Sequence, residues 1–169
     1  MDTLNKLVTQ FNAIVAQSTD KLASNGLEAN VGIYLNSACL KLYKPNWAYP
    51  QSTPVTAETR IFFSIWVTPE SLLAQQLFYN IHAFKLRKFP GYRIESRKFA
   101  AAFRKRFEPY SRDWPNVRTD FGPLTLMEGS LQYTQTDFDE MVTSLLLRFL
   151  RMSVIIDETL SCFVYKSKP

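Results

Sequence analysis

The sequence is poor in glycine, and its five glycines are widely separated, at Gly26, Gly32, Gly91, Gly122 and Gly129. P-loop nucleotidases, dinucleotide-binding domains and serine hydrolases with a nucleophile elbow each need two or more glycines at fixed short spacings. None of those spacings occurs in this chain. The sequence therefore disfavours nucleotide-binding loops of these types and hydrolases of the elbow type.

Cysteine and histidine are also scarce. The two cysteines, Cys39 and Cys162, lie far apart in apolar surroundings, and His82 is the one histidine. This set lacks the spacing of a zinc site, so we predict neither a bound metal nor a cofactor. Two free buried thiols are more plausible than a disulfide framework, which predicts a reducing, cytoplasmic location.

No uninterrupted apolar stretch approaches the ~20 residues that a membrane span needs. The nearest candidate, residues 145–156, is interrupted by Arg148 and Arg151. The first residues also lack a basic segment followed by an apolar one, so no signal peptide is evident. We expect a protein that does not enter a membrane. The oligomeric state is not indicated by any pattern in the sequence.

Composition and length indicate one globular domain over residues 1–169. Apolar residues make up 46% of the chain and charged residues 21%, which is ordinary for a folded protein. Aromatic residues reach 14%. So many rings indicate either a core built from large side chains or rings exposed for binding, and composition does not separate the two.

Apolar residues at three- and four-residue steps predict an N-terminal helix over residues 3–23, ended by Asn25 and Gly26. The same period predicts a short helix from Ser96 to Phe107, with Phe99, Phe103 and Phe107 on one side. A long C-terminal helix is expected after Thr136, since acidic residues follow in the turn where the helix dipole favours anions.

Alternating apolar residues predict strands over residues 31–43 and 59–67. The first strand changes parity, which a bulge near residues 36–38 would explain. Residues 70–75 suggest one helical turn, followed by a strand over 78–86 that we prefer to a rival helix over 70–84. Residues 119–133 read as extended. The predicted fold is α+β: an antiparallel sheet of about four strands with the N-terminal, short basic and long C-terminal helices packed on it.

The segment Lys85–Arg118 concentrates the positive charge of the chain. It contains eleven of the twenty lysines and arginines but only three acidic residues, a local net charge of +8, whereas the whole chain carries +5. On a helical wheel, cations of residues 96–107 lie opposite the phenylalanines. Tyr92, Tyr110 and Trp114 in the flanking loops could stack on unpaired bases. The candidate binding residues are Arg97, Lys98, Arg104, Lys105, Tyr92, Tyr110 and Trp114.

The leading hypothesis is a non-enzymatic module that binds nucleic acid, another polyanion or an acidic protein through this segment. One alternative is an enzyme of unassigned class, with His82 and a carboxylate such as Glu70 or Glu95 in a cleft, or His82 paired with Cys39. Another alternative is a protein–protein interaction module that uses exposed rings. The basic helix would look the same if it were only a core-packed helix with a solvated face. The rings that an interaction module of this kind would use are Trp47, Tyr49 and Trp114.

Overall fold

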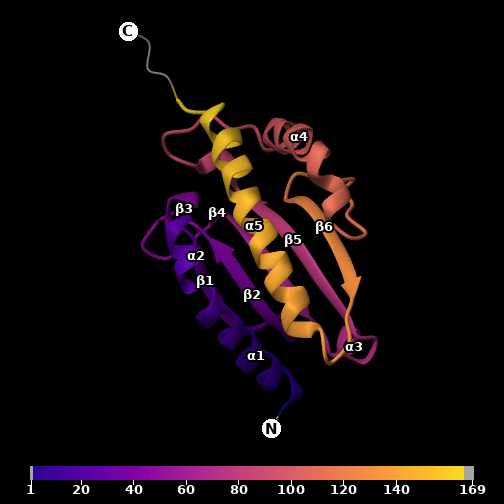
Figure 1. The fold of residues 1–169 in the computed structure, drawn as a ribbon. Helices are drawn as coiled ribbons and strands as arrows, with labels where there is room; N and C mark the ends of the chain where they lie inside the picture. The colour runs from indigo at the N-terminus through magenta and orange to yellow at the C-terminus, as the bar shows by residue number, and fades with distance from the viewer. Residues whose placement is uncertain (1, 166–169) are drawn as a thin grey trace.

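The computed structural model describes residues 2–165 and confirms the predicted α+β class (Figure 1). One antiparallel sheet carries helices on one side. The sheet has six strands, rather than about four, in the order β1-β2-β4-β5-β6, and the short β3 pairs with β4. The strands are β1 (Glu28–Tyr34), β2 (Ser37–Tyr43), β3 (Ala48–Tyr49), β4 (Thr59–Val67), β5 (Gln76–Phe84) and β6 (Thr125–Gln132).

The predicted strand over 31–43, with a bulge, is instead the β1–β2 hairpin. Leu35 and Asn36 form its turn with φ angles of 48° and 58°, and Tyr34 pairs directly with Ser37. Two successive residues with positive φ are the geometry of a tight hairpin turn that matches strand twist. A leucine in that turn is atypical, so the change of parity looked like an irregularity within one strand.

Two helices replace the one predicted over residues 3–23, because α1 ends at Gln17 and α2 begins at Thr19. Ser18 separates them, and its backbone N–H bonds back to the carbonyl of Val15. The short basic helix has the predicted bounds. The helices are α1 (Thr3–Gln17), α2 (Thr19–Ser24), α3 (Pro69–Leu73), α4 (Ser96–Phe107) and α5 (Phe138–Ser161), with 3-10 turns η1 (Pro45–Trp47), η2 (Leu86–Lys88) and η3 (Glu108–Asp113).

The preference for a strand over the rival helix is confirmed, but β5 spans Gln76–Phe84 and not residues 78–86, because Leu86 belongs to η2. The helix that precedes it, α3, ends at Leu73. Thr68 caps α3 by accepting from the backbone N–H of Ser71 at 2.9 Å. Gln75 then adopts a φ of 53°, which turns the chain into the strand. A left-handed residue of this kind commonly ends a helix.

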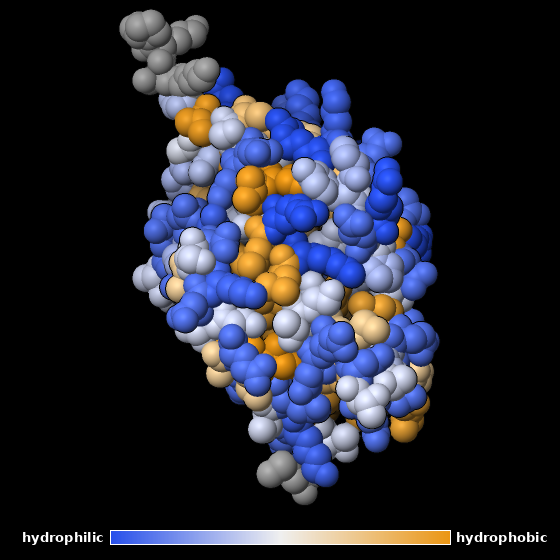
Figure 2. Space-filling view, in the orientation of Figure 1, coloured by the Kyte–Doolittle hydropathy of each residue, from blue (hydrophilic) through white to orange (hydrophobic). Residues whose placement is uncertain are grey.

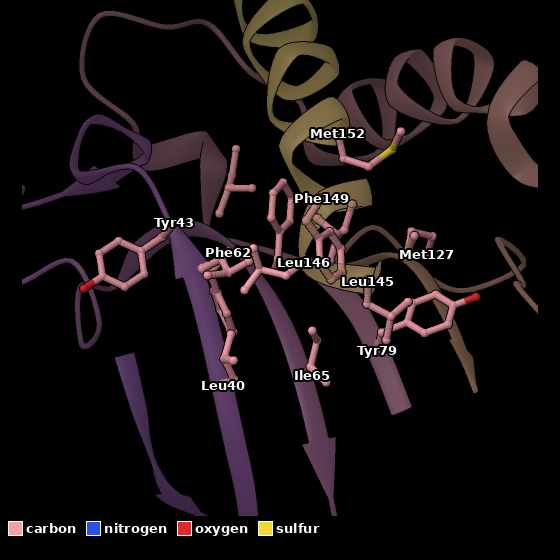
Figure 3. Packing of buried hydrophobic residues seen from close by; sticks show 14 of the residues in the cluster. Leu40, Tyr43, Phe62, Ile65, Tyr79, Met127, Leu145, Leu146, Phe149 and Met152 are labelled. Atoms are coloured by element: carbon pink, nitrogen blue, oxygen red, sulfur yellow. The ribbon is translucent and has the colours of Figure 1, made fainter. Parts of the chain in front are cut away.

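The core lies between the sheet and the helices α1 and α5. Figure 3 shows Leu145, Leu146 and Phe149 of α5 reaching toward the strands. The Phe149 ring stacks on that of Phe63 with 4.5 Å between centroids, and both side chains are fully buried. Burying each such side chain contributes roughly 1.5–3 kcal/mol to folding. The aromatic richness of the sequence thus supplies much of the core.

The helical side of the molecule mixes apolar and charged surface. Figure 2 shows apolar side chains gathered along the middle of this side, over α5. Leu147 and Val154 of that helix are 38% and 50% exposed. Among the described residues, none of the helices combines the length and apolarity that a membrane crossing requires.

Candidate functional site

The basic segment forms η2, α4 and η3, and it packs against α5 and β6 at one end of the sheet (Figure 1). Three shallow depressions of about 360, 440 and 520 Å³ lie along α4. The cations that line them, apart from Arg104, are Arg87 and Arg97 in the first, Arg97 in the second, and Lys105 and Arg112 in the third. Each depression also has one acidic side chain in its lining: Glu95, Asp120 and Glu108, respectively. We name these four cations, Arg87, Arg97, Lys105 and Arg112, the basic edge.

Several other cations of the segment already have acidic partners. Lys85 and Lys88 both contact Glu58, at 2.9 and 3.0 Å. Their hydrogen bonds and positive charges lower the pKa of the Glu58 carboxyl to about 2. Lys98 pairs with Glu95 at 3.1 Å, within the first turn of α4.

Arg118 pairs with Asp120 at 2.7 Å, which neutralises another cation of the segment. In contrast, no residue of the basic edge forms an ion pair with an acidic residue in the part of the chain that the structure describes. Besides Arg104, two further cations of the segment lack a carboxylate partner among these residues: Arg93 lies against the Tyr165 ring, and Arg106 donates to the Ala102 carbonyl and to the Cys162 sulfur. Unlike these two, the four cations of the basic edge line the depressions along α4.

Arg104 does not point outward with the other cations of α4. Its guanidinium donates to the carbonyls of Phe121 and Gly122 at 3.0 and 3.1 Å, and to those of Thr125 and Leu126 at 2.9 and 3.1 Å. Partial burial lowers its pKa, although the side chain remains a cation. Arg104 thus fixes the segment that leads into β6. A helical wheel cannot show this, because its partners lie about twenty residues further along the chain.

Trp114 belongs to the core. Only 3% of it is exposed, and its ring packs against those of Tyr79 and Phe149, with centroids 5.1 and 4.9 Å apart. A ring covered in this way has no free face for stacking on a base. The flanking position of Trp114 in the sequence gave no indication of these contacts, because both partners come from distant elements.

The two tyrosines are half-buried at the margins of the segment. Tyr92 packs against Phe89 with 4.7 Å between ring centroids. The ring of Tyr110 lies 5.7 Å from the guanidinium carbon of Arg151. Of the seven candidate residues, three are exposed on α4: Arg97, Lys98 and Lys105. Tyr92 and Tyr110 are partly exposed. Arg104 and Trp114 make contacts inside the protein that stabilise the fold.

His82 lies on β5, and both of its ring nitrogens have partners. Nδ1 is 3.3 Å from the carbonyl oxygen of Leu124, and Nε2 is 2.9 Å from the side-chain nitrogen of Asn80. The tautomer protonated at Nδ1 satisfies both contacts, since Nδ1 then donates and Nε2 accepts. Burial lowers the pKa of His82, so the ring is neutral near pH 7. A base whose lone pair is already engaged is poorly placed to take a substrate proton.

The carboxylate nearest to this group is Glu128, which was not among the candidates. Glu128 accepts from the side-chain nitrogen of Asn80 at 3.1 Å and so is linked to His82 through Asn80. The cross-strand pairing of Asn80 with Glu128 brings them together. Only the register of β5 and β6 could reveal this neighbour, because 48 residues separate the two positions.

Cys39 is not paired with His82, because β4 lies between their strands. Burial raises the pKa of the Cys39 thiol to about 11. A thiol with this pKa is protonated near pH 7 and is a weak nucleophile. The structure therefore gives no support to a Cys–His catalytic pair.

Comparison with known proteins adds no further assignment. The chain matches no protein-family model, and searches of curated proteins and of solved structures return no match.

Proposed function

We propose that this chain is a non-enzymatic nucleic-acid-binding domain whose contact surface is the basic edge. The observation that carries the proposal is that Arg87, Arg97, Lys105 and Arg112 line successive depressions along α4 and form no ion pair among residues 2–165. Cations that meet phosphates release condensed counterions, which drives binding without base-specific contacts.

The spacing of the basic edge suits a phosphate backbone. Arg97 and Lys105 are eight residues apart on α4, which at 1.5 Å per residue is about 12 Å. Phosphates of one strand of a duplex advance about 3.4 Å along its axis, so about 12 Å spans three to four of them. Ala101 lies between these cations and is exposed, so the backbone of α4 can approach a ligand closely.

The two alternatives find less support in the side-chain geometry. The enzyme alternative needs an accessible base, and both nitrogens of His82 are engaged. The interaction module needs exposed rings, but Trp47 and Trp114 are 0% and 3% exposed. Of the three rings considered for that role, only Tyr49, at 53%, is presented to solvent.

The test is the salt dependence of binding to a labelled duplex and to a single strand of the same sequence, followed by fluorescence anisotropy. With four phosphate contacts the log–log slope on duplex DNA should be about −3.6, and Arg97→Gln with Lys105→Gln should reduce it to about −1.8. The matched control is Lys6→Gln with Lys21→Gln, which removes the same charge from the exposed sides of α1 and α2.

The proposal fails if the wild-type chain does not bind either oligonucleotide at low salt. It also fails if both double variants weaken binding equally, because net charge alone would then explain the attraction. Binding of an acidic polypeptide in preference to both oligonucleotides, with the same loss in the Arg97 and Lys105 variant, would assign the basic edge to a protein partner instead.

A further inference from the structure

Helices α1 and α5 cover the same side of the sheet (Figure 1). The opposite side carries a second candidate site. Side chains alternate between the two sides of each strand. Leu40, Phe63 and Ile81 therefore enter the core, while the residues next to them in sequence face the other side. These neighbours line a depression of about 370 Å³. We call it the open-face pocket, and the residues that matter for the argument are Lys41, Arg60, Phe62, Asn80, His82 and Glu128.

A row of polar side chains crosses the floor of the open-face pocket. Lys41 on β2 pairs with Ser64 on β4, Ser64 pairs with Asn80 on β5, and Asn80 pairs with Glu128 on β6. Cross-strand partners project to the same side of a sheet. The row extends to Asn30 on β1, the partner of Lys41. Five strands thus each contribute one polar side chain, although these positions are scattered along the sequence.

Aromatic rings border this polar row on both sides. Trp66 and Phe78 are cross-strand partners, two residues along their strands from Ser64 and Asn80. Their rings stack with 5.4 Å between centroids. On the opposite side, Phe62 and Phe84 lie edge to face, also at 5.4 Å. Flat apolar walls around a few polar groups are characteristic of small-molecule sites.

Two cations reach over these rings without a carboxylate partner. The Nζ atom of Lys41 is 3.7 Å from the ring centre of Tyr34 and 5.2 Å from that of Phe62. The guanidinium carbon of Arg60 is 5.1 Å from Phe62 and 4.9 Å from Phe84. Neither cation forms an ion pair within the described residues. The two charges therefore flank one ring, Phe62.

Burying Lys41 and Arg60 side by side costs desolvation free energy. Burial lowers the pKa of Lys41, and the charge of Arg60 lowers it further; burial also lowers the pKa of Arg60. Contact with aromatic faces offsets part of the desolvation. No described carboxylate pairs with either cation to offset the remaining desolvation cost. An anion bound between the two cations would therefore be stabilised by both.

Asn80 provides a second, independent sign of a ligand. It is only 2% exposed, and its side-chain nitrogen contacts both Glu128 and His82, at 3.1 and 2.9 Å. Its Oδ1 atom has no donor among the described residues. The Nε atom of Arg60 likewise has no acceptor. Buried polar atoms are nearly always paired. These two unpaired atoms belong to residues that line the same pocket, so they mark it as a place where polar groups lack partners among the described residues.

We propose that the open-face pocket binds a small organic anion that carries a flat aromatic group. The anionic end lies between Lys41 and Arg60, and the ring packs against the aromatic border. A volume of about 370 Å³ lies within the range of small-molecule sites. Neighbouring side chains cover Asn80 Oδ1 and Arg60 Nε, so the anion is held by the accessible part of the two cationic side chains. His82 and Glu128 both accept from the Asn80 side-chain nitrogen and so fix the orientation of that amide.

The test uses four probes, naphthoate, its neutral counterpart naphthamide, naphthyl phosphate and inorganic phosphate, titrated at millimolar concentrations and followed by the backbone amide resonances. We expect naphthoate or naphthyl phosphate to shift amides of β2, β4 and β5. Naphthamide should bind at least about tenfold more weakly, because it lacks the charge-assisted hydrogen bonds. Preference between naphthoate and naphthyl phosphate distinguishes a carboxylate ligand from a phosphorylated one.

Two single substitutions test the cations. Lys41→Gln and Arg60→Gln should each weaken naphthoate binding about tenfold or more and leave naphthamide binding unchanged, whereas Lys41→Arg should retain most of it. Lys21→Gln on α2 is the matched control. Thermal unfolding checks that each variant folds, and Lys41→Gln alone suffices if Arg60→Gln does not fold. Saturable binding of a probe that does not depend on its charge would overturn the proposal.

Three other results would also overturn it. The first is the absence of any shift with all four probes, and the second is shifts confined to α4. The third is inorganic phosphate binding as tightly as naphthyl phosphate, since the aromatic border would then have no role. None of these results bears on the basic edge, which is tested with oligonucleotides and other substitutions.

Discussion

Gly129→Ala is expected to destabilise the protein strongly, although it adds only one methyl group. Gly129 lies on β6 opposite Tyr79, on the helical side of the sheet. A Cβ atom at position 129 would lie 2.2 Å from the hydroxyl oxygen of Tyr79 and 2.4 Å from its ring carbon Cζ. It would also lie 2.9 Å from the carbonyl oxygen of Pro115, which is backbone and moves less easily.

The size of the effect follows from how Tyr79 is held. Its side chain is fully buried, and its hydroxyl donates to the Pro115 carbonyl at 2.5 Å. Forcing an extra carbon into a packed core costs about 1–3 kcal/mol, and losing the buried hydrogen bond costs about 1 kcal/mol more. We expect a loss of about 2–4 kcal/mol. At 2–4 °C per kcal/mol for a chain of this size, the melting temperature should fall by roughly 4–16 °C.

Thermal and urea unfolding measure this change. The matched control is Gly122→Ala, because nothing lies within 4 Å of a Cβ at position 122, and its effect should be within about 0.5 kcal/mol. Combining Gly129→Ala with Tyr79→Leu, which removes the clashing atoms, should cost less than the sum of the two single changes. A Gly129→Ala variant as stable as the wild type would refute the reasoning.

Two further predictions concern polar side chains that are partly buried. Asp157→Ala removes the acceptor of the buried Trp47 indole N–H, now 2.8 Å away, and the partner of Lys44 at 2.6 Å. It should cost about 1–3 kcal/mol in urea unfolding, and in a Trp47→Phe background the cost should be smaller; an equal cost in both would contradict the role of the indole bond. His82→Gln should flatten the pH dependence of stability, since burial lowers the pKa of His82 from its usual 6.5. A lowered pKa means that the contribution of His82 to folding stability is fully present above about pH 6.5 and is lost as pH falls. Melting temperatures measured from pH 5 to 8 that change equally with pH in the wild type and in the variant would contradict this.

The regular elements could be predicted because their signals are local. The alternation of apolar residues over 59–67 and the spacing of Phe99, Phe103 and Phe107 give β4 and α4 with the bounds that the structure shows. The β1–β2 turn could not be predicted with equal success, because it uses Leu35 and not the glycine or asparagine pair that normally identifies such turns.

The candidate site was predicted less completely than the fold. Charge counting found Arg97, Lys98 and Lys105, which are exposed on α4. It also selected Arg104, whose partners include Leu126 of β6. Trp114 was chosen for its place in a flanking loop, but its ring packs against Tyr79 of β5 and Phe149 of α5. Arg104 and Arg97 are the same residue type on the same helix, so the sequence alone does not distinguish a cation bonded within the fold from an exposed one. Only the contacts in the structure distinguish them.

The sequence by itself determined which residues share one side of each strand and helix, because that depends on periods of two and about 3.6 residues along the chain. The tertiary structure decided which strands are neighbours and in what register. That register gathers Lys41, Ser64, Asn80 and Glu128 into one row across the sheet. Long-range pairing is a property of the whole fold, and no local pattern around any of these four residues contains it.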